Sequence, residues 1–253
     1  MERLFRGEAY CLTGYGIIML KNLRFGRSIF AVCLVLLFYF FILQLRVEAS
    51  FEQVVSVTWQ RAPMREALMQ FANANRVGLF IDRRIDPSTL INFKAENKTV
   101  KKVFQDFADS AGFYCYFFGS VVYIGNTEMR EILPRVILEH RKFIEQLDSA
   151  NKNKVLTTAR VKLRKMVTVK LPILSEPKKV LSNLAQQHQF TWQNLDKLQH
   201  DVWDENTLPS MQLGDLLILM LIGFNLDYVC ESPDKGSSDK LILRIIEIPK
   251  NTQ

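Results

Sequence analysis

One order of strands and helices occurs twice in this chain, and it limits the fold to a small set of mixed architectures. Between Val54 and Asn126 the pattern reads strand, helix, strand, strand, helix and hairpin. Pro63 and Thr99 stand where the two helices are expected to begin, and Gly112 stands where the second is expected to end. Apolar side chains cover one face of each helix, which predicts helices packed on a sheet.

The same order returns between Val167 and Ile248, although Asp196 to Ser210 contains no clear counterpart of the third strand. Apolar helix positions in the two stretches match at a spacing of 113 residues. The matching pairs are Leu68 with Leu181, Ala72 with Ala185, Val100 with Leu213 and Phe104 with Leu217. We therefore expect an α+β fold of two tandem small domains, each with two helices packed on one face of a small mixed sheet.

A hydrophobic run precedes these stretches and determines the expected compartment. Ile29 to Leu43 is 15 residues long without a charge, which is short for a membrane span of about 20 residues and slightly long for a signal peptide core. Two interpretations stay open: a signal peptide cleaved after Ala49, or an uncleaved inner-membrane anchor formed by residues 29–45. In both cases the chain after Ser50 is exported to the periplasm or cell envelope.

The basic residues before the run are Lys21, Arg24 and Arg27. They form an n-region of ordinary length if translation starts at Met19 and a long one if it starts at Met1. The expected division is residues 1–28 as n-region, 29–49 as signal peptide or anchor, 50–127 as first domain, 128–165 as a helical and basic linker, and 166–253 as second domain.

Two quoted stretches carry a family resemblance. VSVTWQRAPMREALMQFANANRVGLFID and NKTVKKVFQDFADSAGFYCYFFGSVVYIGN together resemble the secretin and TonB short N-terminal (STN) domain over residues 54–126, with a divergent second copy at 167–248. The resemblance implies a periplasmic module that makes protein–protein contacts or oligomeric rings, with no enzymatic activity and no cofactor. No barrel-forming region follows in this sequence, so we expect no pore from this chain alone.

A basic segment is the most unusual feature of the second stretch. Ser149 to Ser175 contains seven Lys or Arg residues and no Asp or Glu. Read as a strand, it places basic side chains on one face and apolar ones on the other. The candidate contact residues for an anionic partner are Arg160, Lys162, Arg164 and Lys170. Lipid headgroups, an acidic envelope polymer or an acidic protein patch fit this face, and a solvated outer face or a lysine-guarded edge strand is the alternative.

The remaining residues indicate no chemistry. After residue 49 the chain has 27 Lys and Arg against 23 Asp and Glu, too small an excess to predict nucleic-acid binding. No GxSxG, HExxH or P-loop motif is present. His200-Asp201, with Asp204 and Glu205 nearby, favours a structural turn over a metal site. Cys115 and Cys230 are expected as two buried thiols rather than a disulfide.

These observations predict a non-enzymatic, exported cell-envelope protein that serves as a protein–protein interaction module, without metal or cofactor. Its partner is expected to be another envelope protein or a second copy, and no small-molecule substrate is indicated. The alternatives are a membrane-anchored oligomeric scaffold, held by residues 29–45, and a binder of anionic envelope polymer.

Overall fold

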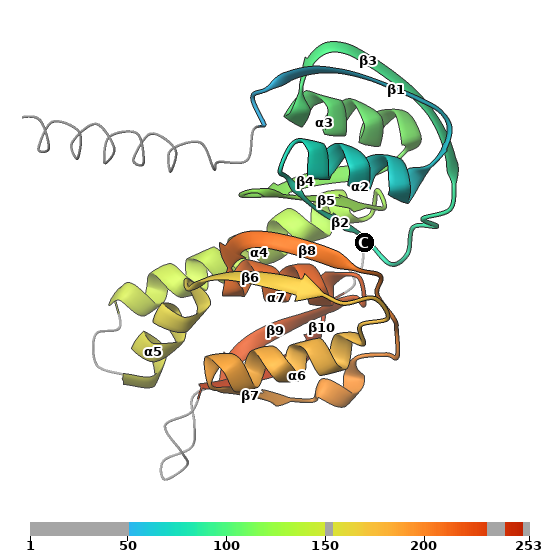
Figure 1. Cartoon of the computed structure of the whole chain (residues 1–253). Helices are drawn as coiled ribbons and strands as arrows, with labels where there is room; N and C mark the ends of the chain where they lie inside the picture. The colour runs from blue at the N-terminus through green and yellow to red at the C-terminus, as the bar shows by residue number, and fades with distance from the viewer. Residues whose placement is uncertain (1–50, 150–153, 232–240, 250–253) are drawn as a thin grey trace, which may run out of the picture. The chain divides into compact units, whose positions relative to one another are not determined.

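A two-stranded ribbon, two helices and a three-stranded sheet make up the first half of the protein. They are seen in a computed structural model that describes residues 51–149, 154–231 and 241–249 (Figure 1). In the ribbon, β1 pairs antiparallel with β3, and in the sheet, of order β2-β5-β4, β2 runs parallel to β5. The elements are β1 Val54–Pro63, α2 Met64–Ala74, β2 Gly78–Ile81, β3 Leu90–Thr99, α3 Val100–Ala111, β4 Tyr114–Phe118 and β5 Val121–Gly125.

The second half repeats these pairings. β6 pairs antiparallel with β8, and in the sheet β7-β10-β9 the strand β7 runs parallel to β10. α6 begins 113 residues after α2, and α7 begins 113 residues after α3. The elements are α4 Met129–Ser149, α5 Lys154–Leu163, β6 Met166–Leu171, α6 Pro177–His188, β7 Phe190–Gln193, the 3-10 turn η1 Leu195–Lys197, β8 Asn206–Gln212, α7 Leu213–Ile222, β9 Leu226–Glu231 and β10 Leu241–Glu247. The expected α+β class is confirmed.

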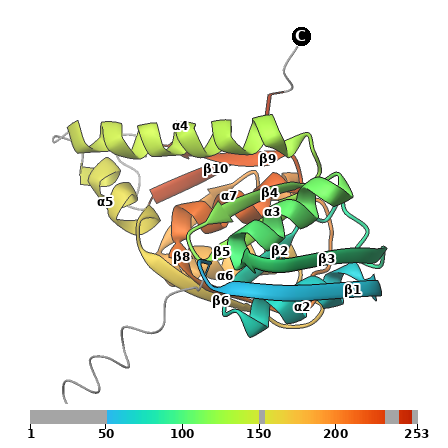
Figure 2. The ribbon, with the colours of Figure 1, turned by 90° about the horizontal axis from the view of Figure 1, so that it is seen from above.

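The helices of the first half lie between the ribbon and the sheet (Figure 2). Trp59 of β1 and Phe93 of β3 each meet Phe107 of α3 edge-on, with ring centroids 5.6 Å apart. Val122 and Ile124 of β5 belong to the same buried cluster from the opposite side. The helices are therefore covered on two sides, whereas the sequence predicted one sheet with helices on one of its faces.

The predicted boundaries of α3 and its hairpin are confirmed. The Thr99 hydroxyl accepts a hydrogen bond from the Lys102 amide at 3.2 Å, which satisfies one of the free N–H groups of the first turn. Gly112 ends the helix at φ 72°, a left-handed conformation that glycine adopts without a Cβ clash. Gly119, at φ 54°, turns β4 into β5.

The sheet β2-β5-β4 also faces the second half. Phe80, Val121 and Tyr123 point away from α2 and α3 and belong to the same buried cluster as α6 and α7. On β8, the Pro209 ring lies so close to Gly78 that a Cβ at that position would be 2.3 Å from Pro209 Cδ. Residues 49–253 accordingly form one compact unit.

Residues 128–165, expected as a linker, form α4 and α5. Met129, Leu133 and Val136 of α4 are at most 3% exposed and lie in the core of the second half. Among the described residues, no helix is both long and apolar enough to cross a membrane. The expected signal peptide or anchor at 29–49 lies outside those residues.

The predicted basic strand is wrong in its first part. Residues 154–163 are the helix α5, and only Met166–Leu171 form the strand β6. Ala159 and Leu163, four residues apart, are buried while Val161 is 64% exposed, so burial follows a helical period. Arg160, Lys162 and Arg164 therefore do not share a strand face with Lys170.

Candidate functional site

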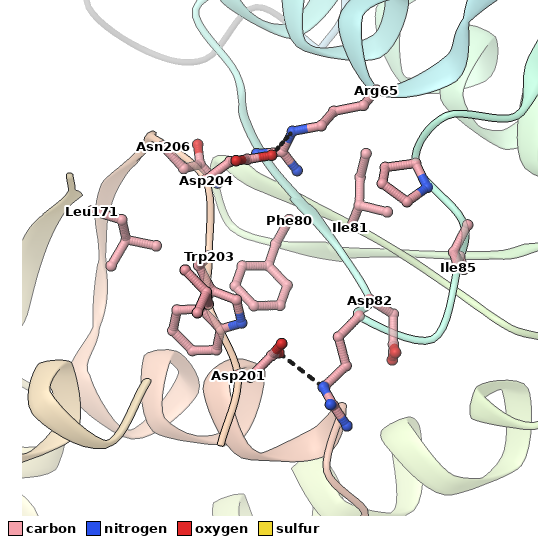
Figure 3. Close-up of a pocket in the computed structure, with 13 residues that line it drawn as sticks. Arg65, Phe80, Ile81, Asp82, Ile85, Leu171, Asp201, Trp203, Asp204 and Asn206 are labelled. Atoms are coloured by element: carbon pink, nitrogen blue, oxygen red, sulfur yellow. Dashed lines mark hydrogen bonds and ion pairs between the residues drawn. The ribbon is translucent and has the colours of Figure 1, made fainter. Parts of the chain in front are cut away.

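A cavity of about 170 Å³ opens where β2 faces the loop that precedes β8 (Figure 3). Phe80 of β2 and Trp203 of the loop meet edge-on across it, with ring centroids 5.8 Å apart. Trp203 was expected to pack onto the second half, and it contacts both halves, since Phe224 lies 6.4 Å away. The cavity thus has an aromatic wall built from both halves.

Arginines of the first half reach acidic and amide groups of the second across this cavity. Arg83 Nε lies 2.9 Å from Asp201 Oδ2, and Arg65 Nε lies 3.1 Å from Asp204 Oδ2 (Figure 3). The Arg83 guanidinium also lies 4.5 Å from the centre of the Phe224 ring. These side chains are partly exposed, so each pair stabilises the contact only modestly.

A buried polar cluster lies behind the cavity, centred on Asp82. Arg84 donates hydrogen bonds to both carboxylate oxygens of Asp82, at 2.8 and 2.6 Å, and the Tyr123 hydroxyl donates another. Burial raises the pKa of Asp82, but the hydrogen bonds from Arg84 and Tyr123 lower it further, and the net shift is downward. Asp82 is therefore held ionised. Arg84 Nη1 also donates to Asn225 Oδ1 at 2.7 Å, which ties this cluster to the second half.

The charged groups around the cavity are engaged with one another. Asp201 and Asp204, which the sequence placed in a structural turn with His200, hold arginines of the first half. In the parts of the chain that the structure describes, no group of three or more His, Cys, Asp or Glu side chains is placed to hold a metal ion. The arrangement joins two halves and supplies no paired nucleophile and base.

The two cysteines of the described chain are free, as expected. Cys115 lies on β4 and Cys230 on β9, the corresponding strand of the second half. Burial raises the pKa of each thiol to about 12. Because the thiolate is the nucleophile, both are inert near neutral pH.

His188 differs from its sequence interpretation. A partly charged imidazole was expected at the end of α6, but the side chain is 7% exposed. Burial lowers its pKa, and the nearby Lys165 and Lys162 lower it further. His188 is thus a neutral core residue.

The predicted anionic-contact residues are dispersed. Arg160 and Lys162 lie in the last turn of α5, where Lys162 Nζ donates to the carbonyl of Gln189 at 2.5 Å. Arg164 follows the helix, and Lys170 lies on the exposed face of β6. The structure keeps only Lys170 on the strand face that the sequence proposed.

An open sheet edge is the second candidate site. β4 is the last strand in the order β2-β5-β4, and no described strand pairs with its outer edge. Tyr114, Tyr116 and Phe118 form an aromatic row on one face, with ring centroids 6.4 and 5.0 Å apart. In the second half, His140 of α4 contacts the equivalent strand β9, with Nε2 2.7 Å from Asp227 Oδ1.

Sequence reasoning missed both sites. The pairs that line the cavity join residues more than a hundred positions apart, and the consecutive arginines at 83 and 84 after an apolar strand were the only local signal. No family model matches the chain, and no curated protein or solved structure matches it either. Function is therefore inferred from the residues and their arrangement.

Proposed function

We propose that this chain is a non-enzymatic protein–protein interaction module of the cell envelope, built from two tandem STN-like domains. The observation that carries the proposal is the open edge of β4 with its aromatic row. The repeated order of elements and the STN-like residues of the first half support the domain assignment.

The edge of β4 offers the two parts of a strand-addition site. Its outward N–H and C=O groups can hydrogen-bond to an extended segment of a partner, which gives affinity. Tyr114 and Tyr116, both half-buried, can contact alternate side chains of that segment, which gives selectivity. The β1-β3 ribbon has open edges too, but its outer face is polar and carries exposed charges such as the Lys94–Glu96 pair.

The chemistry of the cavity favours binding over catalysis. Asp82, Asp201 and Asp204 are each engaged by an arginine. A group that is fully paired and held ionised is poorly suited to exchange protons with a substrate. These side chains serve to hold the two halves together, and with them the sheet that ends in β4.

Site-specific photocrosslinking in the native envelope tests the proposed interface. A photoreactive amino acid in place of Tyr116 is expected to capture one discrete protein species, and the same residue in place of Gln70, exposed on α2, is not. The mass of the adduct separates a second copy from another envelope protein. Identical patterns at both positions, or no adduct at Tyr116, contradict the proposal.

N-terminal sequencing with intact mass, on protein from the envelope fraction, tests the proposed location. An N-terminus at Ser50 supports a soluble periplasmic module. An intact hydrophobic run starting from Met1 or Met19 supports the anchored scaffold. Recovery of the protein from the cytosolic fraction alone contradicts both forms of the proposal.

A further inference from the structure

The second half contains a loop that the first half lacks. In the first half β1 ends at Pro63 and α2 begins at Met64, without an intervening residue. In the second half β6 ends at Leu171 and α6 begins at Pro177, so that residues 172–176 are inserted between corresponding elements. The first half makes the same fold without these residues, so the fold does not require them.

The inserted loop directs apolar side chains to solvent. Ile173 and Leu174 are each 69% exposed, and neither belongs to a buried cluster. Leu174 has φ 61°, in the left-handed region that a leucine adopts only at a cost in free energy. Burial in this structure does not offset that cost, which indicates that the side chain is placed for a contact outside the chain.

The exposed face of β6 continues this surface. Met166, Thr168 and Lys170 alternate with buried residues, and Met166 is 55% exposed. Lys165, exposed just before β6, and Lys170 form no ion pair with a described residue. Met166, Lys165, Lys170, Ile173 and Leu174 are together called the β6 surface.

The β6 surface contains no acidic group of its own. Residues 149–175 include no Asp or Glu. The acids that come next are engaged elsewhere: Glu176 Oε1 lies 2.5 Å from Lys179 Nζ, and Asp204, on the segment that bridges to Ser175, holds Arg65. The surface therefore combines exposed apolar side chains with uncompensated positive charge.

We infer that the β6 surface docks on an anionic lipid bilayer, with Ile173 and Leu174 inserted at the boundary between headgroups and acyl chains. Apolar side chains on a projecting loop suit a bilayer, because they can enter it without a complementary groove. Lys165 and Lys170 match the negative potential of the headgroup layer. This surface lies on β6 and the loop that follows it, not on β4, so its test is independent of the proposed protein interface.

A local probe in the full-length chain tests the inference, because it reports on the loop whether or not residues 29–45 are also in the membrane. An environment-sensitive fluorescent amino acid replaces Ile173 in protein reconstituted with lipid vesicles. In vesicles containing phosphatidylglycerol its emission is expected to shift to the blue, and in pure phosphatidylcholine the shift should be largely lost. The matched control is the same probe in place of Leu90, an apolar residue 54% exposed on β3, which should not respond.

Charge reversal supplies the second measurement. Lys165→Glu and Lys170→Glu, made in the probe-bearing chain, are each expected to lower the ratio of inserted to free loop by about fivefold, and added salt should act in the same direction. Circular dichroism confirms that these exposed substitutions leave the fold intact.

Three outcomes overturn the inference. The probe at position 173 can remain unaffected by any vesicle, or respond equally with and without phosphatidylglycerol, which removes the electrostatic contact. It can also shift without vesicles, in proportion to protein concentration, which makes a second copy the occupant of the β6 surface.

Discussion

At the scale of single residues, Asp82 is the polar side chain on which most contacts converge. Its carboxylate is fully buried and receives hydrogen bonds from Arg84 and Tyr123. We expect Asp82→Asn to lower the free energy of unfolding by about 3 kcal/mol, because it leaves the buried Arg84 charge without its counter-ion. Urea unfolding followed by circular dichroism measures the change. Glu66→Gln, at an exposed position on α2, is the control and should change little.

The same residue predicts a dependence of stability on pH. The pKa of Asp82 is lowered in the folded protein from an ordinary value of 3.8. The ionised carboxylate therefore contributes stability that is fully present above pH 3.8 and is lost as pH falls through the lower folded-state pKa. Between these two values, the free energy of unfolding of Asp82→Asn should fall less steeply with pH than that of the unmodified chain. Parallel slopes for the two proteins contradict this assignment.

At the scale of elements, α3 depends on a side-chain cap. Thr99 satisfies the Lys102 amide, and the Thr99 hydroxyl is the only group of that side chain able to do so. Thr99→Ala is expected to lower the free energy of unfolding by about 1 kcal/mol, and Thr99→Ser should restore most of it. Chemical denaturation of the three proteins provides the comparison, and equal losses in Ala and Ser remove the cap as the cause.

The contact between β2 and β8 leaves no space for a side chain at Gly78. A Cβ there lies 2.3 Å from Pro209 Cδ, so Gly78→Ala should lower the free energy of unfolding by about 2 kcal/mol through overpacking. Pro209→Ala removes the clashing ring atoms and should recover part of that loss in the double variant. A double-mutant cycle measures this coupling. Additive losses contradict a direct contact.

The sequence predicted those elements whose local signals agree. α2, α3 and α6 combine helical apolar spacing with a proline or threonine at their start, and the β4–β5 hairpin has its Gly-Ser turn. β8 was missed because Asn206–Gln212 contains Pro209 and has no strong alternation. It is a strand through its pairing with β6, which is a tertiary contact.

The misread segment and the cavity have related causes. In α5 the alternation of basic and apolar residues imitates a strand, and only the burial of Ala159 and Leu163 against the core distinguishes the helix. The Arg83–Asp201 pair spans both halves. No pattern within a local window encodes such a contact, so the candidate site could not be predicted from the sequence.

At the scale of the whole molecule, the sheet β2-β5-β4 serves two cores. Leu79, Val122 and Ile124 point into the first core, and the intervening Phe80, Val121 and Tyr123 point into the second. Strand alternation produces this division directly. Separating the halves exposes large apolar side chains from a central sheet, which costs free energy in proportion to the apolar area exposed.

The two halves should therefore unfold in one transition, and tryptophans placed in each half make this measurable. Trp59 lies in the first core, and Trp192 packs in the second half, with its indole N–H donating to the carbonyl of Leu181 at 2.9 Å. Two variants that each retain one of these tryptophans, with the others replaced by Phe, are expected to give the same urea midpoint by fluorescence as by circular dichroism.

Gly78→Ala distinguishes true coupling from a coincidence of stabilities. It acts at the junction of the halves, so it should lower the midpoint reported by Trp59 and the one reported by Trp192 by the same amount. If only the Trp59 transition moves, the first half unfolds independently and the shared sheet does not couple the two cores. A fragment of residues 51–126 then folds alone, whereas coupling requires that it stay unfolded with the Phe80, Val121 and Tyr123 face uncovered.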